Sequence, residues 1–191
     1  MGRVFADSNV LFPFSVMDLL LALSEDGLHQ VIWTGDLLDE WERVIVREKK
    51  RSPVSAAQIT TAVREFFEDS EVERDEYEHL IAEMPGKDPD DHAHMAAAVA
   101  RQPCTILTNN AKDFPPAPLA KRGVRVTDPD SYLCEIVENL PDEVIDTVVR
   151  LAVEKTRPPK TPHDLVDDLA HAGVPRFATE VRDLLARRAG A

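Results

Sequence analysis

Cysteine and long apolar runs are both scarce in this 191-residue sequence. The two cysteines, Cys104 and Cys134, do not lie at a metal-binding spacing, so neither a disulfide scaffold nor a structural zinc site is expected. No apolar segment approaches the roughly 20 residues that span a bilayer. Asp7 also interrupts the N-terminus before a signal-peptide run could form. We therefore expect a cytoplasmic protein with no membrane partner.

Positive charge is scarce as well, since 22 Lys and Arg residues stand against 35 Asp and Glu residues, for a net charge of -13. Such acidity disfavours nonspecific binding to polyanions. A role on RNA or DNA would need either metal ions that neutralise acids or a local basic patch. One basic cluster ends a predicted helix and either complements the helix dipole or contacts phosphate. Its members are Arg47, Lys49, Lys50 and Arg51.

Apolar segments alternate with helical patterns along most of the chain. Short strands are predicted near residues 4–6, 29–34, 105–108 and 124–126, and one more is possible around Val72. Strands that alternate with helices indicate an α/β fold with a mainly parallel sheet. No strand pattern follows Pro141. We therefore predict a domain over residues 1–140 and a small helical C-terminal appendage over 141–191, with two short helices at its end.

Several residues are typical of helix starts. Thr34 or Asp36 is expected to cap the helix that follows the second strand. Residues 55–58 form a capping-box pattern for a helix that ends near Glu68. Asp88 is expected to cap a further helix, with Pro89 in its first position.

Four acids occupy comparable places relative to the predicted strands: Asp7, Glu40, Asp91 and Asp113. Such positions can converge at the carboxyl edge of a parallel sheet, and Asn9 can point at the same spot. Each acid alone has a structural explanation, as a turn, a dipole partner, a cap or a loop residue. For all but Asp7 that explanation is the favoured one, but the joint placement indicates a site.

Convergent carboxylates repel one another and raise each other's pKa unless a positive group joins them. Mg²⁺ or Mn²⁺ prefers oxygen ligands and can activate a bound water while it stabilises charge on a scissile phosphate. The acids therefore predict metal-dependent phosphodiester hydrolysis without a covalent intermediate. His92 and His94 are expected on the helix surface, and Trp33 and Trp41 in the core.

Four motifs occur in order: FADSNVL at residues 5–11, LLDEWERV at 37–44, DPDDHAHMAAA at 88–98 and LTNNAKDF at 107–114. Together they resemble the successive motifs of PIN-domain ribonucleases, and most of all the VapC-type toxins of bacterial toxin–antitoxin pairs. The resemblance covers roughly residues 3–132. A helical C-terminal extension like this one occurs in a subgroup of that family.

The resemblance implies a three-layer α/β/α domain, an acidic Mg²⁺ or Mn²⁺ site and cleavage of RNA. It also implies a homodimer and an antitoxin whose C-terminal segment covers the active site. The residues that match the family's acids are Asp7, Glu40, Asp91 and Asp113. Asn9 and Thr108 match its supporting polar positions. Asn110 departs from the pattern, because many members have an acid at that place.

Two other functions remain open from the sequence. A haloacid-dehalogenase-like phosphatase also has an aspartate after its first strand, but it needs a second aspartate where Asn9 stands. A PIN-like fold could also serve as a binding module without catalysis, which intact Asp7, Glu40 and Asp91 disfavour. A measurement of activity distinguishes the three.

Overall fold

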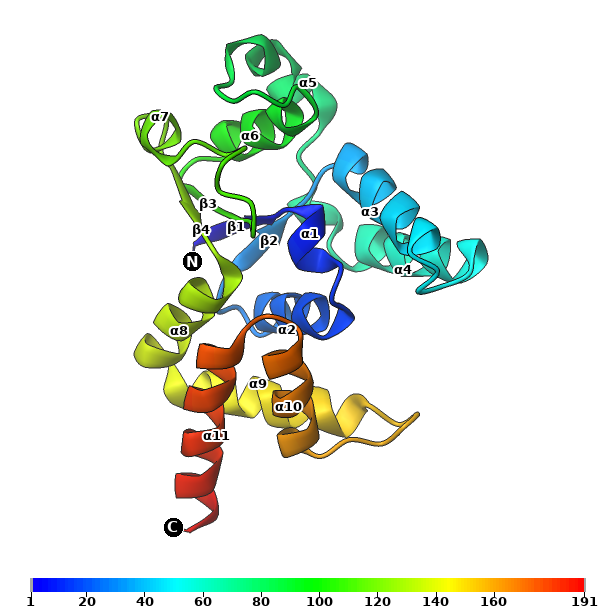
Figure 1. Cartoon of the computed structure of the whole chain (residues 1–191), viewed down its shortest axis with the longest axis vertical. Helices are drawn as coiled ribbons and strands as arrows, with labels where there is room; N and C mark the ends of the chain where they lie inside the picture. The colour runs from blue at the N-terminus through cyan, green and yellow to red at the C-terminus, as the bar shows by residue number, and fades with distance from the viewer. Residues whose placement is uncertain (1, 191) are drawn as a thin grey trace. The chain divides into compact units, whose positions relative to one another are not determined.

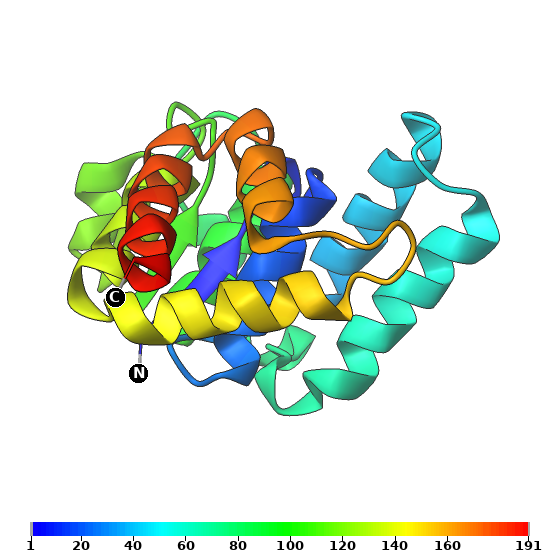
Figure 2. The ribbon, with the colours of Figure 1, turned by 90° about the horizontal axis from the view of Figure 1, so that it is seen from below.

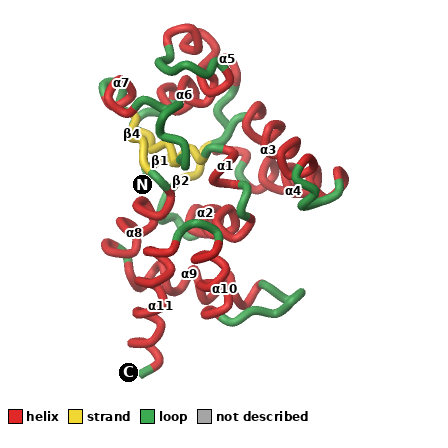
Figure 3. The backbone as a smooth tube through the Cα atoms, in the orientation of Figure 1, coloured by secondary structure: helices red, strands yellow, loops and turns green. Residues whose placement is uncertain are grey.

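A parallel four-stranded sheet organises the part of the chain that carries the predicted site. The computed structural model describes residues 2–190. The sheet has the order β2-β1-β3-β4, and Figure 3 shows its strands gathered in one place. The strands are β1 (Arg3–Ala6), β2 (Gln30–Ile32), β3 (Cys104–Leu107) and β4 (Val124–Thr127). This arrangement confirms the expected α/β class.

Most residues of β1, β2 and β3 are apolar and buried on both faces of the sheet, as in a parallel sheet covered on two sides. Val4, Phe5, Ile32, Ile106 and Leu107 are each 0% exposed. The continuous apolar runs that predicted the strands are therefore the interior of the sheet.

The register of the sheet brings the carboxyl ends of neighbouring strands to the same level. Ala6 at the end of β1 pairs with Leu107 at the end of β3, and Leu107 pairs with Thr127. The chain runs from β1 to β2 on one side and returns to β3 on the other side of β1. A reversal of this kind opens a crevice outside the carboxyl ends of the two central strands.

The contacts of the chain divide it into two compact units, and the first comprises residues 2–12 and 30–127. Besides the sheet it contains two 3₁₀ turns, η1 (Glu68–Ser70) and η2 (Glu78–Glu83). In Figures 1 and 2, α3 and α4 run side by side as a hairpin. The helices of this unit are α1 (Ser8–Leu11), α3 (Gly35–Arg47), α4 (Pro53–Phe66), α5 (Arg74–Tyr77), α6 (Asp90–Ala100) and α7 (Pro116–Ala120).

The second unit is helical and comprises residues 13–29 and 128–190. Helices α9, α10 and α11 contact one another, and Figure 2 shows α9 lying across the direction of the other two. Buried Asp130 accepts hydrogen bonds from the first backbone N–H groups of α11, at 2.9 Å for Phe177. The helices are α2 (Phe14–Glu25), α8 (Pro129–Asn139), α9 (Pro141–Glu154), α10 (Pro162–His171) and α11 (Pro175–Ala189). Among residues 2–190, no helix is long and apolar enough to cross a membrane.

Some helix starts follow the sequence signals and one does not. Thr34 caps α3, since its hydroxyl oxygen accepts from the Leu37 N–H at 3.1 Å. The predicted capping box at residues 55–58 is wrong. Helix α4 begins earlier, at Pro53, and the Ser52 hydroxyl accepts from the Ser55 N–H at 3.2 Å. Proline fixes a helical φ and needs no N–H partner, so it starts the helix and leaves the cap to the residue before it.

Other local expectations also need correction. Helix α4 ends at Phe66, and the last helix is longer than expected, with 15 residues. Val72 lies outside any strand, next to a single bridge between Trp33 and Glu71. Helix α3 ends at Arg47, and Lys49 adopts a left-handed φ of 55°, so Lys49–Arg51 form a turn beyond the helix. The short helices α1 and α7 have too few residues to show a helical period.

The corrected cap can be tested by a pair of serine variants. Ser52→Ala should lower the free energy of unfolding by about 1 kcal/mol, because it removes the acceptor of an N-terminal N–H group. Ser55→Ala is the matched control, a half-buried serine in the same turn whose side chain caps nothing, and should change the free energy of unfolding by less than about 0.5 kcal/mol. Urea unfolding monitored by circular dichroism measures both. If Ser55→Ala lowered the free energy of unfolding more than Ser52→Ala does, Ser55 would be the cap instead.

Candidate metal centre

Asp7 leaves the end of β1 and is 5% exposed. Its backbone N–H donates to the Leu107 carbonyl at 2.9 Å, which ties it to the end of β3. Its side-chain Oδ2 accepts from the Thr108 hydroxyl at 2.8 Å and from the Asn9 amide. Asn9 in turn accepts from the Asn109 N–H at 3.1 Å. The structure thus brings Asp7 together with both residues predicted to support it.

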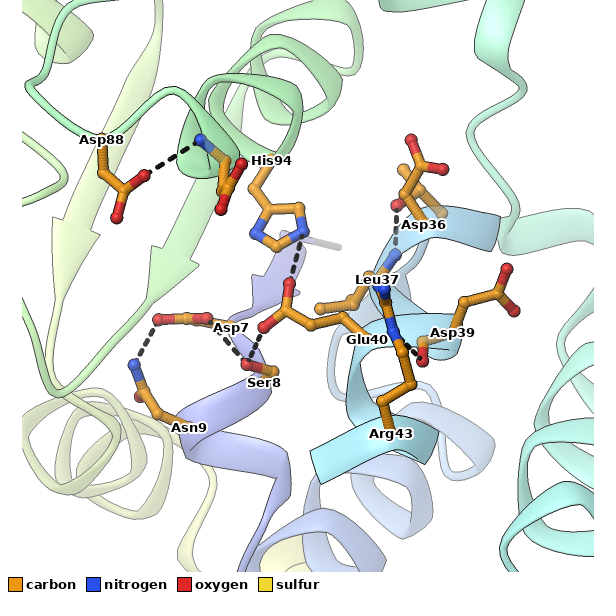
Figure 4. A network of polar contacts seen from close by, with 12 residues as sticks. Asp7, Ser8, Asn9, Asp36, Leu37, Asp39, Glu40, Arg43, Asp88 and His94 are labelled. Atoms are coloured by element: carbon orange, nitrogen blue, oxygen red, sulfur yellow. Dashed lines mark hydrogen bonds and ion pairs between the residues drawn. The ribbon is translucent and has the colours of Figure 1, made fainter. Parts of the chain in front are cut away.

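Glu40 approaches the same place from α3. Its Oε1 accepts from the Ser8 hydroxyl, and its Oε2 lies 3.6 Å from His94 Nε2. Figure 4 shows the side chains of Ser8, Glu40 and His94 directed toward one another, with Asp7 beside Ser8. Residues Leu37, Leu38, Trp41 and Ile45 bury the opposite stripe of α3. This amphipathic pattern fixes the direction in which Glu40 points.

Asp91 lies in the first turn of α6 and is half-buried, whereas Asp90 before it is exposed. The Asp88 side chain accepts from the Asp90 N–H at 3.1 Å, and Pro89 has helical φ and ψ angles of −63° and −26°. Asp88 therefore makes the expected capping contact, although the regular helix is counted only from Asp90. The cap orients the turn that carries Asp91.

Asp113 follows β3 in a tight turn. Its N–H donates to the Asn110 carbonyl at 3.2 Å, and the Asn110 side-chain amide donates to the Asp113 carboxylate. The Asn110 N–H donates to the Thr108 hydroxyl oxygen at 3.0 Å. Asn110 and Asp113 therefore lie on one side of a single turn attached to the end of β3, where Asn110 is exposed and Asp113 is half-buried.

The electrostatic effects on Asp91 and Asp7 show that the acids are near one another. Burial is the largest cause that raises the pKa of Asp91, which reaches about 7. Negative charges add to this effect, and they come from Asp7, Asp88, Asp113 and Glu40. Burial also raises the pKa of Asp7, against the hydrogen bond from Thr108 that lowers it. Carboxylates from four elements thus share one electrostatic environment.

An open groove of about 1310 Å³ passes over this region. Ser8 and Asn9 line it, but Asp7 and Asp113 are not part of its wall. Its carboxylates are Asp36, Asp39, Glu40, Glu42, Glu48, Asp88, Asp90 and Asp91, and its arginines are Arg43, Arg47 and Arg74. The arginines contact Asp39, Glu48 and Asp36, respectively. The negative charge of the groove therefore exceeds its positive charge.

The predicted basic cluster lies at one end of this groove. Arg47 lines it and is 71% exposed. Lys50 lies outside the wall, with its ammonium nitrogen 5.8 Å from the centre of the Phe12 ring, and Phe12 lines the groove. Of the four basic residues, Arg47 is therefore the one that reaches the groove directly.

The donor set fits a hydrated, hard divalent cation. Within residues 2–190, no three His, Cys, Asp or Glu side chains are close enough together to form a closed metal site. Mg²⁺ does not need one, because it keeps several waters and binds through one or two carboxylates. The acids supply only oxygen donors. At Asp91 the main electrostatic contributions all come from negative side chains, and no positive side chain is among them. Asp7, Glu40, Asp91 and Asp113 could share such an ion with water.

Two residues of this region were not predicted to belong to it. Ser8 donates a hydrogen bond to Glu40. The sequence feature that could have identified Ser8 is its position directly after Asp7, at the end of a strand. The expectation that His94 lies on the helix surface is wrong, since it is 3% exposed. His94 follows Asp91 by three residues, so both share one face of α6, and that face is turned toward the sheet. Trp33 and Trp41 are buried, as expected.

The raised pKa of Asp91 predicts a pH dependence of stability. Its folded pKa of about 7 exceeds the ordinary value of 3.8, so the folded state binds more protons between these values. The free energy of unfolding should therefore fall as the pH rises from about 4 to about 7. Asp91→Asn should remove this contribution, leaving the variant more stable than the wild type at about pH 8 and equal at about pH 4.

Thermal unfolding of both proteins in excess EDTA measures the difference. Asp90→Asn is the control, because Asp90 is exposed on the adjacent helical position. A difference in thermal midpoint that stays constant from about pH 4 to about pH 8 would contradict the assignment.

Comparisons with known proteins agree with this geometry. The family described as "PIN domain" matches residues 3–112, and the family described as "VapC50 C-terminal domain" matches residues 129–183. A curated relative from Mycobacterium tuberculosis (strain ATCC 25618 / H37Rv), named "Putative ribonuclease VapC50", is 32% identical over 108 residues. That alignment covers 56% of this chain and 63% of the relative.

No solved structure matches the chain significantly. The two family matches confirm the resemblance to VapC-type PIN proteins that carry a helical C-terminal extension. The PIN match spans more than half of the chain and includes three of the four predicted acids, Asp7, Glu40 and Asp91. This chain belongs to the PIN domain family.

Proposed function

We propose that this protein is a Mg²⁺- or Mn²⁺-dependent endoribonuclease that acts as the toxin of a type II toxin–antitoxin pair. One observation carries the proposal: Asp91 is half-buried close to Asp7, Glu40, Asp88 and Asp113, and burial together with their negative charges raises its pKa to about 7. Carboxylates gathered in this way repel one another unless a cation joins them. The acids surround the crevice of the sheet, where α/β proteins bind their ligands.

The ion would be held by carboxylates of Asp7, Glu40 and Asp91, with Asp113 acting directly or through water. When bound, Mg²⁺ or Mn²⁺ supplies the positive charge that activates water and stabilises charge on a scissile phosphate. The hydrogen bonds from Thr108 and Asn9 occupy Asp7 Oδ2 and fix the plane of that carboxylate. Asp7 Oδ1 lies 3.5 Å from the Ser8 hydroxyl, a longer contact than those at Oδ2, so it is the oxygen that we assign to the ion.

The groove suits a chain-like substrate better than a small molecule. It is open, and its wall includes one face of α3, where Glu40, Arg43 and Arg47 follow one another at helical spacing. Arginine binds phosphate in a fork geometry, so Arg43 and Arg47 would hold phosphates next to the acids. The curated relative's name describes a ribonuclease, which supports RNA as the substrate. Lys49, Lys50 and Arg51 would add attraction beyond the groove.

The proposed partners follow from the same surface and from the family. An acid-rich groove suits a cationic segment of an antitoxin, which would compete with both the ion and the RNA. The toxin assignment rests on the VapC50 name of the relative and of the C-terminal family. We also propose a homodimer, with the nuclease over residues 1–140 and the extension over 141–191.

The metal requirement is the first test. Pure protein should cleave single-stranded RNA only with added Mg²⁺ or Mn²⁺, and excess EDTA should abolish the cleavage, because the acids otherwise repel the phosphate. Gel analysis of a labelled RNA measures this, with the Asp7→Asn variant as a control for contaminating nucleases. Undiminished cleavage in excess EDTA would contradict the proposal. Hydrolysis of p-nitrophenyl phosphate without RNA cleavage would favour a phosphatase instead.

The three aspartates at the start of α6 provide the second test. Asp91→Asn should lower the cleavage rate by about 100-fold or more, since it removes a charge from the centre. Asp90→Asn should change the rate by less than about threefold, because its side chain points roughly 100° away around the helix. Asp88→Ala should mainly lower the free energy of unfolding, by about 1 kcal/mol. Equal loss of cleavage in the Asp90 and Asp91 variants would refute the assignment.

A further inference from the structure

The Glu40 carboxylate is contacted at both of its oxygens by side chains from two other elements. Oε1 accepts from the Ser8 hydroxyl, and Oε2 lies 3.6 Å from His94 Nε2 (Figure 4). Ser8 is 7% exposed and His94 is 3% exposed, whereas the Glu40 side chain is 36% exposed. A half-exposed glutamate is therefore contacted by two buried side chains.

The surroundings of His94 determine which of its two ring nitrogens carries the proton. Nδ1 is buried and has no hydrogen-bond partner among the described residues. The ring packs against Phe5, with ring centres 5.4 Å apart. A proton on Nδ1 would be a buried, unsatisfied donor, and it would leave the bare lone pair of Nε2 facing a carboxylate. The neutral ring therefore carries its proton on Nε2, whose N–H dipole points toward Glu40.

The two contacts differ in strength. The Ser8 contact is a hydrogen bond to a charged acceptor, which is among the stronger interactions of its kind. The 3.6 Å separation at His94 is longer than a hydrogen bond, so that contact is electrostatic and steric. Together they restrict the rotation of Glu40 without neutralising its charge.

We propose that Ser8 and His94 are positioning residues that hold Glu40 in the orientation in which it binds the divalent cation. The inference rests on the proposed function, because that function assigns the cation to this site. Glutamate has several rotatable side-chain bonds, and fixing them before the ion arrives removes an entropy cost from binding. Groups that orient a metal ligand typically change metal affinity by about 10–100-fold when they are removed.

The competing explanation is that Ser8 and His94 are only buried polar groups that stabilise the fold. The chain offers a matched control for it. The Thr60 hydroxyl donates to Glu42 Oε2 at 2.8 Å, and Thr60 is 3% exposed. Glu42 lies on the same helix as Glu40, two residues further on. Thr60→Val therefore removes a comparable hydroxyl–glutamate bond while Glu40 stays untouched.

The experiment measures Mn²⁺ binding to the full-length protein by electron paramagnetic resonance, without RNA. Ser8→Ala should weaken Mn²⁺ binding by about tenfold. Ser8→Thr, which keeps the hydroxyl, should bind nearly as tightly as the wild type. Thr60→Val should lower the thermal midpoint but leave Mn²⁺ binding unchanged. His94→Phe keeps a ring beside Phe5, removes the N–H dipole and should also weaken binding, and it tests the proposal if Ser8→Ala does not fold.

A double-mutant cycle shows whether Ser8 acts through Glu40. Glu40→Gln should weaken Mn²⁺ binding, and adding Ser8→Ala to it should cause no further loss. Additive losses, wild-type affinity in Ser8→Ala, or no Mn²⁺ binding by the wild type would each overturn the proposal. Tight Mn²⁺ binding without RNA cleavage would instead refute the nuclease function and leave the positioning role standing.

Discussion

Repulsion among carboxylates at the carboxyl ends of β1 and β3 is the constraint on which the rest of this structure depends. The parallel register makes Asp7 and Thr108 leave the sheet at one level, so their side chains meet. Helices α3 and α6 then bring Glu40 and Asp91 to the same place. A fold that concentrates negative charge in this way loses stability without a cation, and the proposed divalent ion would relieve that cost.

The sequence carries enough information to predict the sheet and the direction of the acids. Short apolar runs such as residues 4–6 and 106–107 are typical of buried strands. Asp7 and Thr108 follow those runs directly, and the carboxyl ends of parallel strands lie at one edge of the sheet. The position of Glu40 could be predicted because α3 has a strong apolar stripe and a threonine cap at its start. Helices and strands can therefore be placed from the sequence where a segment is long and periodic or fully apolar.

The parts that the sequence did not predict need information that a local pattern does not supply. Ser52 and Ser55 both stand at a helix-start signal, and the structure selects Ser52, because Pro53 takes the first position of α4. His94 is polar and next to small residues, so its burial against Phe5 cannot be read from spacing alone. The pairing of Asn110 with Asp113 needs a tight turn in a loop that has no periodic pattern. A local sequence pattern does not show which side chains meet in the folded chain.

The helical unit is built from two separate stretches of chain, because α2 lies between α1 and β2 in sequence and yet packs with α9 and α10. Helix α2 has a continuous apolar surface that includes Val16, Leu19, Leu20 and Leu23. The C-terminal helices are therefore not a detachable module that recombination could add or remove freely. Removal of residues 128–190 would expose the apolar surface of α2, which lies in the sequence between Asp7 and Glu40. The C-terminal helices therefore cover a segment that lies between two of the acids, so the stability of that segment depends on them.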